Sequence, residues 1–247
     1  MKLKNKKYKL RPWVKITFIV LLSVLVGSLA IKSLSKSKET VEEKNLPTAS
    51  IVIDAGHGGI DSGTIGVDDE KTCEKDLALV YSKEIKKQIN QINPNVKVYF
   101  TRTNDQLSWI DEDTTDFQLD DLNGRTKLIN KIHPDFMLSI HFNFCDSSKM
   151  HGYTAYTKEK DHISQDIFHR IDSNLDKENW SQSLECRSTK DFPLQLVDCV
   201  KSPSMLFEVG FLSSPKELDS LKKEENRVMI SRAIAQAYCS YIEENNK

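Results

Sequence analysis

Residues 51–59 read Ile-Val-Ile-Asp-Ala-Gly-His-Gly-Gly and give the clearest indication of the fold. Three apolar residues in a row are typical of a short buried strand. The glycines that follow permit positive φ angles and let the backbone approach a ligand closely. The stretch therefore predicts a strand that runs into a tight turn and presents His57 at its carboxyl end.

Strands and helices alternate along the rest of the chain. The clearest helix starts near Glu74, because Leu77, Ala78 and Tyr81 lie on one stripe of it. Further strands are predicted at 96–103, 136–140, 152–157, 194–197 and 205–207, and further helices at 124–132, 163–175, from 215 onward and at 224–243. The acidic segment 104–122 has no periodicity and is expected to be a surface loop, while 176–191 favours neither state. This order predicts one α/β sandwich with a mostly parallel sheet.

The first fifty residues differ from the rest in charge and hydropathy. They carry eleven Lys and Arg against three acids, and the sixteen residues 16–31 carry no charge. That run is slightly short of the ~20 residues that span a bilayer comfortably. Two interpretations remain open, namely an uncleaved single-pass anchor with a cytoplasmic N-terminus and a signal peptide cleaved near the small residues 28–30. Both predict an extracytoplasmic domain, which is membrane-anchored in the first case and secreted in the second.

The chain is accordingly divided into three parts. They are a basic leader with an anchor or signal at 1–31, a polar linker at 32–48 and a folded domain at 49–247. The chain after residue 50 holds 24 bases and 33 acids, so it repels phosphate backbones and nucleic acid is excluded as a partner. Five cysteines without a Cys-x-x-Cys pair indicate neither a zinc knuckle nor a thioredoxin-like motif, and pairing of Cys186 with Cys199 stays open against free thiols.

Four polar residues carry the chemistry. His57, His141 and Glu208 fall at the ends of predicted strands, which is where open α/β sheets bind ligands. Glu74 lies on the buried stripe of its helix, where a carboxylate needs a partner. Two imidazoles and one carboxylate form a catalytic zinc set that leaves a position for water, and a further carboxylate can accept the water's proton. Glu208 fits that second role by position.

The residues alone leave simpler explanations open. A first-turn Glu is favoured by the helix dipole without any metal. The two histidines are not joined by a short His-x-x-x-His signature, and a histidine in a glycine-rich turn is more often structural than metal-binding.

Four segments resemble the zinc-dependent N-acetylmuramoyl-L-alanine amidases in order and spacing. They are 51–63 (IVIDAGHGGIDSG), 74–77 (EKDL), 139–143 (SIHFN) and 207–213 (FEVGFLS). The resemblance extends to 101–103 and 124–130, and so covers nearly all of 50–243. It implies a three-layer α/β sandwich and a peptidoglycan hydrolase that cleaves the amide between the lactyl group of N-acetylmuramic acid and L-alanine of the stem peptide. It also implies one Zn²⁺ on His57, Glu74 and His141, with Glu208 as the catalytic carboxylate.

Three further residues match or neighbour the family pattern. Arg102 and Arg125 are expected either to contact substrate or to form structural salt bridges. Asn143 is expected either to orient a metal ligand or the substrate, or to hold its loop. Cys73 and Glu70 lie close to Glu74 and are alternative metal ligands.

Targeting and activity add the remaining expectations. No wall-binding repeats flank the domain, so we expect the N-terminal segment or an activating protein partner to bring it to peptidoglycan. The anchor-plus-amidase layout resembles spore-cortex amidases of endospore formers. The alternatives are a catalytically silent peptidoglycan-binding regulator of the same fold and an exported zinc peptidase.

Overall fold

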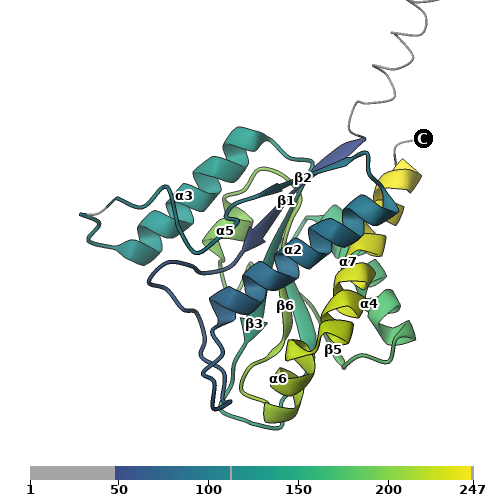
Figure 1. The fold of residues 1–247 in the computed structure, drawn as a ribbon. Helices are drawn as coiled ribbons and strands as arrows, with labels where there is room; N and C mark the ends of the chain where they lie inside the picture. The colour runs from purple at the N-terminus through teal and green to yellow at the C-terminus, as the bar shows by residue number, and fades with distance from the viewer. Residues whose placement is uncertain (1–47, 112, 246–247) are drawn as a thin grey trace, which may run out of the picture. The chain divides into compact units, whose positions relative to one another are not determined.

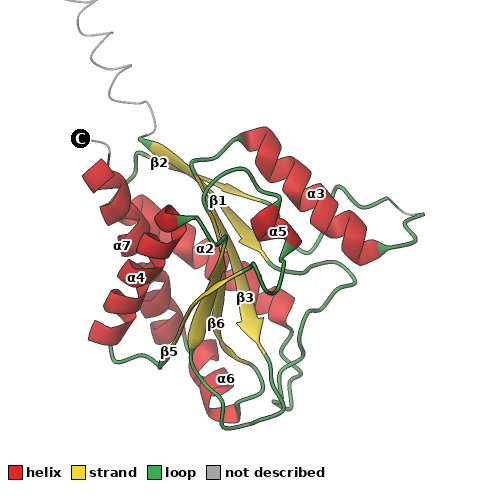
Figure 2. Cartoon of the chain, turned by 180° about the vertical axis from the view of Figure 1, so that it is seen from behind, coloured by secondary structure: helices red, strands yellow, loops and turns green. Residues whose placement is uncertain are grey.

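The computed structural model describes residues 48–245 with the exception of residue 112. Six strands form one sheet in the order β2-β1-β3-β6-β4-β5, with helices on both faces (Figures 1 and 2). Neighbouring strands run parallel except for β4 and β6, which are antiparallel. The predicted α/β architecture with a mostly parallel sheet is therefore confirmed. The strands are β1 (Ala49–Ala55), β2 (Val96–Phe100), β3 (Phe136–Asn143), β4 (Tyr153–Thr157), β5 (Ser183–Ser188) and β6 (Ser204–Phe211).

The helices divide between the two faces of the sheet (Figures 1 and 2). One face packs against α2, α4 and α7, and the other against α3 and α5. The helices are α2 (Glu74–Ile92), α3 (Phe117–Ile132), α4 (His162–Lys177), α5 (Gln195–Asp198), α6 (Pro215–Lys222) and α7 (Glu224–Asn245). Since successive strand residues point to opposite faces, Ile51 and Ile53 enter the large core under α2 and α7, while Val52 enters the smaller one.

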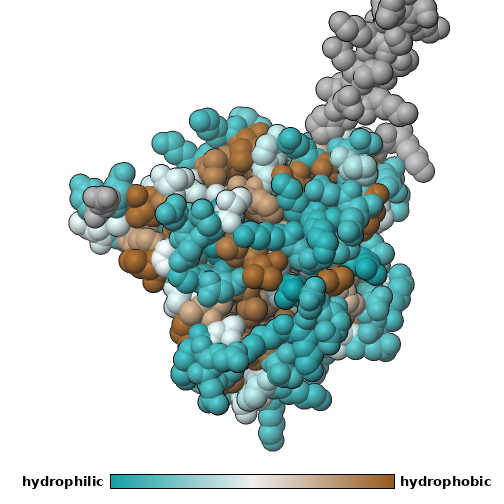
Figure 3. Space-filling model, viewed as in Figure 1, coloured by the Kyte–Doolittle hydropathy of each residue, from teal (hydrophilic) through white to brown (hydrophobic). Residues whose placement is uncertain are grey.

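Helix α2 begins at Glu74, as the apolar stripe predicts. Leu77, Ala78, Tyr81 and Ile85 are buried against the sheet, and Glu74 lies on the same buried side. Figure 3 shows that the outer surface of this side of the molecule is mainly hydrophilic, with apolar residues in smaller patches between. The helix is therefore held by one apolar stripe, and that stripe turns the Glu74 carboxylate inward.

Two predicted elements are wrong. The strand predicted at 194–197 is absent, and Gln195–Asp198 form the helix α5 with Leu194 as its N-cap. The Asp198 carboxylate accepts hydrogen bonds from Leu194 N and Thr189 Oγ1 and closes this helical turn. The expected loop 104–122 ends early, because α3 already begins at Phe117. The buried stripe of α3 opens with Asp121 and Arg125, so it has no apolar periodicity to read. The undecided segment 176–191 contains the edge strand β5.

The predicted leader and anchor at 1–31, and the linker up to residue 47, lie outside the described residues. Within 48–245 no helix combines the length and the apolar character that a bilayer crossing requires. All five cysteines are free thiols, Cys186 and Cys199 included.

Candidate metal centre

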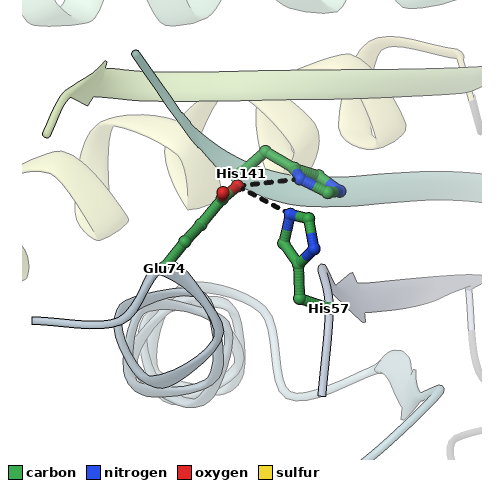
Figure 4. A group of neighbouring side chains, drawn as sticks. All are labelled: His57, Glu74 and His141. Carbon is green, nitrogen blue, oxygen red and sulfur yellow. Dashed lines mark hydrogen bonds and ion pairs between the residues drawn. The ribbon is translucent and has the colours of Figure 1, made fainter. Parts of the chain in front are cut away.

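Three side chains of metal-ligand type converge at the carboxyl ends of β1 and β3. His57 follows β1, Glu74 is the first residue of α2 and His141 lies on β3. Figure 4 shows the Glu74 carboxylate facing both imidazoles, with its Oε1 3.1 Å from His57 Nε2 and 3.0 Å from His141 Nδ1. One potential ligand atom from each residue lies within 4.8 Å of the others. The structure thus brings together the three residues that the sequence placed at a zinc site.

The donor set and the space around it fit Zn²⁺. Two imidazole nitrogens and one carboxylate oxygen are the ligands of many catalytic zinc sites, and a fourth position then stays open. Two glycines leave room for the ligands. A Cβ on Gly56 would lie 2.3 Å from the His141 ring, and one on Gly63 would lie 2.6 Å from His57 and 2.7 Å from Glu74. A larger residue at Gly56 or Gly63 would therefore collide with the side chains of the candidate ligands.

Asp61 is a functional partner that the sequence reasoning missed. Its Oδ2 lies 2.7 Å from His57 Nδ1, and its Oδ1 accepts a hydrogen bond from Gly63 N. A carboxylate only accepts, so it selects the tautomer with a proton on Nδ1 and leaves Nε2 to face Glu74. A carboxylate four residues after the histidine, inside the glycine-rich stretch, was the available signal.

The cluster is electrostatically tuned. Burial alone would lower the pKa of His57, but hydrogen bonds to Glu74 and Asp61 and the charges of both raise it to about 9. Burial alone would raise the pKa of Glu74, yet His141 and His57 hold it below its usual range. The Glu74 carboxylate is 3 % exposed and ionised, so the site stabilises positive charge beside it.

Glu208 lies on β6 directly opposite His141 of β3, on the same face of the sheet. Its Oε2 is buried and has no hydrogen-bond partner among the described residues. Burial, aided by the charge of Glu74 and opposed by the two histidines, raises the pKa of Glu208 to about 7. A carboxyl group with that pKa can both accept and donate a proton at neutral pH.

The alternative ligands near Glu74 lie outside the cluster. Cys73 Sγ contacts the Lys71 carbonyl, and Glu70 pairs with Lys222. Glu74 is the carboxylate that meets both histidines.

The three residues with expected substrate contacts have protein partners in the structure. The guanidinium of Arg102 donates to backbone carbonyls, and that of Arg125 forms ion pairs with Asp54 and Asp121. Both arginines are buried behind the His57 turn. Asn143 ends β3, and its side-chain oxygen accepts a hydrogen bond from Phe144 N. These contacts favour the structural alternative for the two arginines.

Comparison with known proteins gives consistent matches. Residues 51–240 match the family model described as N-acetylmuramoyl-L-alanine amidase. The probable cell wall amidase LytH of Staphylococcus epidermidis is 28 % identical over 204 residues, which are 82 % of this chain and 62 % of LytH. This chain therefore spans less than two thirds of that relative's length.

Solved structures share the fold. The catalytic domain of the amidase CwlV from Bacillus (Paenibacillus) polymyxa is 25 % identical, with a TM-score of 0.66 over 79 % of this chain and 98 % of that one. The CwlD amidase from Clostridioides difficile, solved in complex with the GerS lipoprotein, is 27 % identical, with a TM-score of 0.70 over 80 % of this chain and all of that one.

Proposed function

The chain belongs to the N-acetylmuramoyl-L-alanine amidase family, and on that premise we propose that it hydrolyses the amide between the lactyl group of N-acetylmuramic acid and L-alanine of the peptidoglycan stem peptide. The observation that carries the proposal is the convergence of His57, Glu74 and His141, whose potential ligand atoms lie within 4.8 Å. A fold shared with amidases is not enough, because one fold can serve several functions. The ligand cluster supports hydrolysis over mere binding.

His57, Glu74 and His141 are the residues that would hold Zn²⁺. Zinc, when bound, supplies Lewis acidity, which makes water nucleophilic at neutral pH and polarises the substrate carbonyl. Asp61 keeps the His57 imidazole in the tautomer and orientation that a ligand needs.

Glu208 moves the proton. With a pKa of about 7 it accepts a proton from the attacking water and delivers it to the amine nitrogen that leaves with the stem peptide. Its buried Oε2, which has no partner among the described residues, supports this role, because such an atom is energetically unfavourable and a catalytic role is one reason for a protein to retain it.

Location and partners follow from the proposed substrate. Peptidoglycan lies outside the cytoplasmic membrane, so we place the domain there, delivered by the basic and apolar N-terminal segment as an anchor or a signal. The related CwlD forms a complex with a lipoprotein, which supports a protein partner for this chain, and we propose that such a partner activates it. A role in the spore cortex is a further proposal and rests on the domain layout.

Mass spectrometry of digested peptidoglycan tests the activity. The full chain, supplied with zinc, is incubated with purified wall, and the soluble fragments are analysed. We expect muramic acid with a free lactyl carboxylate and intact stem peptides with a free L-alanine amine. Stem peptides cut internally would identify a zinc peptidase instead. Binding to the wall without any product, under conditions where zinc is bound, would identify a silent regulator.

A further inference from the structure

Two buried arginines donate hydrogen bonds to the backbone of the turn that carries His57. Arg102 donates from Nε to the Ala55 carbonyl at 2.9 Å and from a terminal nitrogen to the Gly56 carbonyl at 2.8 Å. Arg125 donates to the Ala55 carbonyl at 2.7 Å and to the His57 carbonyl at 2.5 Å. Three consecutive carbonyls of the turn are therefore each hydrogen-bonded to a guanidinium, and the two arginines are only 3 % and 2 % exposed.

Arg102 joins this turn to the helix that carries the carboxylate. The same terminal nitrogen that binds Gly56 also donates to the Lys75 carbonyl at 2.7 Å. Lys75 directly follows Glu74 in the first turn of α2. One planar guanidinium thus fixes the relative position of the segments that bear His57 and Glu74.

Arg125 joins the turn to the strand that carries the second histidine. It donates to Asp54 Oδ1 at 2.7 Å, and the other oxygen of Asp54 accepts from Ser139 Oγ at 2.6 Å. Ser139 lies two residues before His141 on β3 and shares its sheet face. The two arginines therefore reach, directly or through Asp54, the segments of all three candidate ligands.

The turn needs such support. His57 has a φ of 60°, in the left-handed region that costs a non-glycine residue energy and persists only where the surroundings impose it. Buried carbonyls also need donors, because leaving one unsatisfied costs about 1–3 kcal/mol. A guanidinium offers five donors in a rigid plane, whereas an ammonium offers three around one point. Lysine can keep the charge at these positions but cannot reproduce the contacts.

We propose that Arg102 and Arg125 are positioning residues of the metal site. They set the zinc affinity by holding the His57 turn and the segments that carry Glu74 and His141 in fixed relative positions. The inference rests on the proposed function, because it assumes that these three residues bind zinc. It replaces substrate contact as the role of both arginines. Substrate contact would raise KM and leave zinc affinity unchanged.

Zinc affinity of the full chain separates the two roles. Arg102→Lys and Arg125→Lys both retain the positive charge. The Arg102 side chain binds only backbone carbonyls, so Arg102→Lys leaves no carboxylate unpaired and can test the proposal even if the Arg125 variant does not fold. Arg170→Lys is the matched control, because Arg170 pairs with Asp166 and Glu244 on α4 and α7. Each metal-free protein is titrated with zinc against a chromogenic chelator, after circular dichroism and a urea midpoint establish that it is folded.

We expect zinc affinity to fall about 10–100-fold in the Arg102 and Arg125 variants, which is typical when the partners of metal ligands are removed, and to change less than about twofold in the control. The absorption spectrum of bound Co²⁺ should shift in the same two variants. Unchanged zinc affinity in folded variants, or a loss that merely matches their unfolded fraction, would overturn the proposal. If His57→Ala binds zinc as tightly as the unaltered protein, the metal site itself is misassigned, and that failure belongs to the proposed function.

Discussion

The two faces of the sheet are built differently. Among the described residues, 35 buried apolar residues form the cluster on the face under α2, α4 and α7, and five form the cluster under α3 and α5. The strand β3 shows the contrast within itself. Leu138 and Ile140 point into the large cluster, whereas Met137 on the other face is followed by Ser139 and His141.

The second face changes character along the strands. It carries the apolar residues Val52, Met137 and Leu206 on β1, β3 and β6, and further towards the carboxyl ends of the same strands it carries Asp54, His141 and Glu208. The difference indicates that the first face supplies most of the stability and that the second supplies His141 and Glu208, to which α2 adds Glu74 at the carboxyl edge of the sheet. Substitutions on the two faces should therefore affect different measurements.

The largest effect is expected at Glu208. Glu208→Gln keeps the size of the side chain but removes the proton acceptor, so turnover should fall about 10²–10⁴-fold while zinc stays bound. His57→Ala should lose zinc and turnover together. Turnover of wall fragments and metal content of the purified proteins measure this pair. If Glu208→Gln also empties the metal site, Glu208 is a ligand and our assignment of the roles is wrong.

Substitution of a buried residue on the apolar face should lower the stability of the protein without changing its zinc affinity. Ile234 on α7 is fully buried, and Ile234→Ala removes several methyl and methylene groups and leaves a cavity. We expect the free energy of unfolding to fall by about 2–5 kcal/mol, with zinc affinity unchanged at temperatures where the variant stays folded. Urea unfolding and chelator competition measure the two quantities. A loss of zinc affinity in the folded variant would mean that the faces are coupled.

The sequence predicted the elements whose pattern is local. The strand at 51–53 and the stripe of α2 each follow from short segments and are present in the structure, and the three candidate ligands, which short motifs also indicate, lie together. The contacts of the arginines could not be predicted in this way. Arg102 and Arg125 meet the Ala55 carbonyl from 47 and 70 residues away, so no local pattern encodes those contacts.

The start of α3 was missed for a related physical reason. Its inward stripe carries the ion-paired Asp121 and Arg125 before the apolar Ile129, and hydrophobic periodicity detects only the last of these. The face that carries the chemistry is therefore also the face whose secondary structure is harder to read from the sequence. The buried charged residues mark this face in the structure, but in the sequence they interrupt the apolar periodicity by which its elements would be predicted.

Acid should lower the free energy of unfolding by protonating Asp54, which lies on the second face of the sheet. Burial alone would raise the pKa of Asp54, but Arg125, Ser139 and Thr101 lower it to about 2. Because the pKa is lower in the folded state than in the unfolded chain, the resulting stability is present above about pH 4 and is lost as the pH falls towards 2. We expect a loss of about 2 kcal/mol from this group, at ~1.4 kcal/mol per unit of pKa.

Urea unfolding between pH 2 and 5 measures this dependence. Asp54→Asn should be less stable at pH 5 and should lose less stability on acidification than the unaltered protein. Parallel stability curves for the two proteins would show that Asp54 does not carry the dependence.

The smallest effect is expected on the outer side of the apolar face. Arg170 of α4 is a quarter exposed, and its guanidinium lies 2.7 Å from Glu244 and 3.3 Å from Asp166. Partly exposed ion pairs contribute about 0–1 kcal/mol, because water and salt screen them and both side chains lose freedom. Arg170→Ala should therefore reduce stability by no more than ~1 kcal/mol, the reduction should shrink in high salt, and zinc affinity should not change. Urea midpoints at two salt concentrations and chelator competition measure this. A clear drop in zinc affinity would show that any lost arginine disturbs the metal site, and the contrast between the two faces would then have no functional meaning.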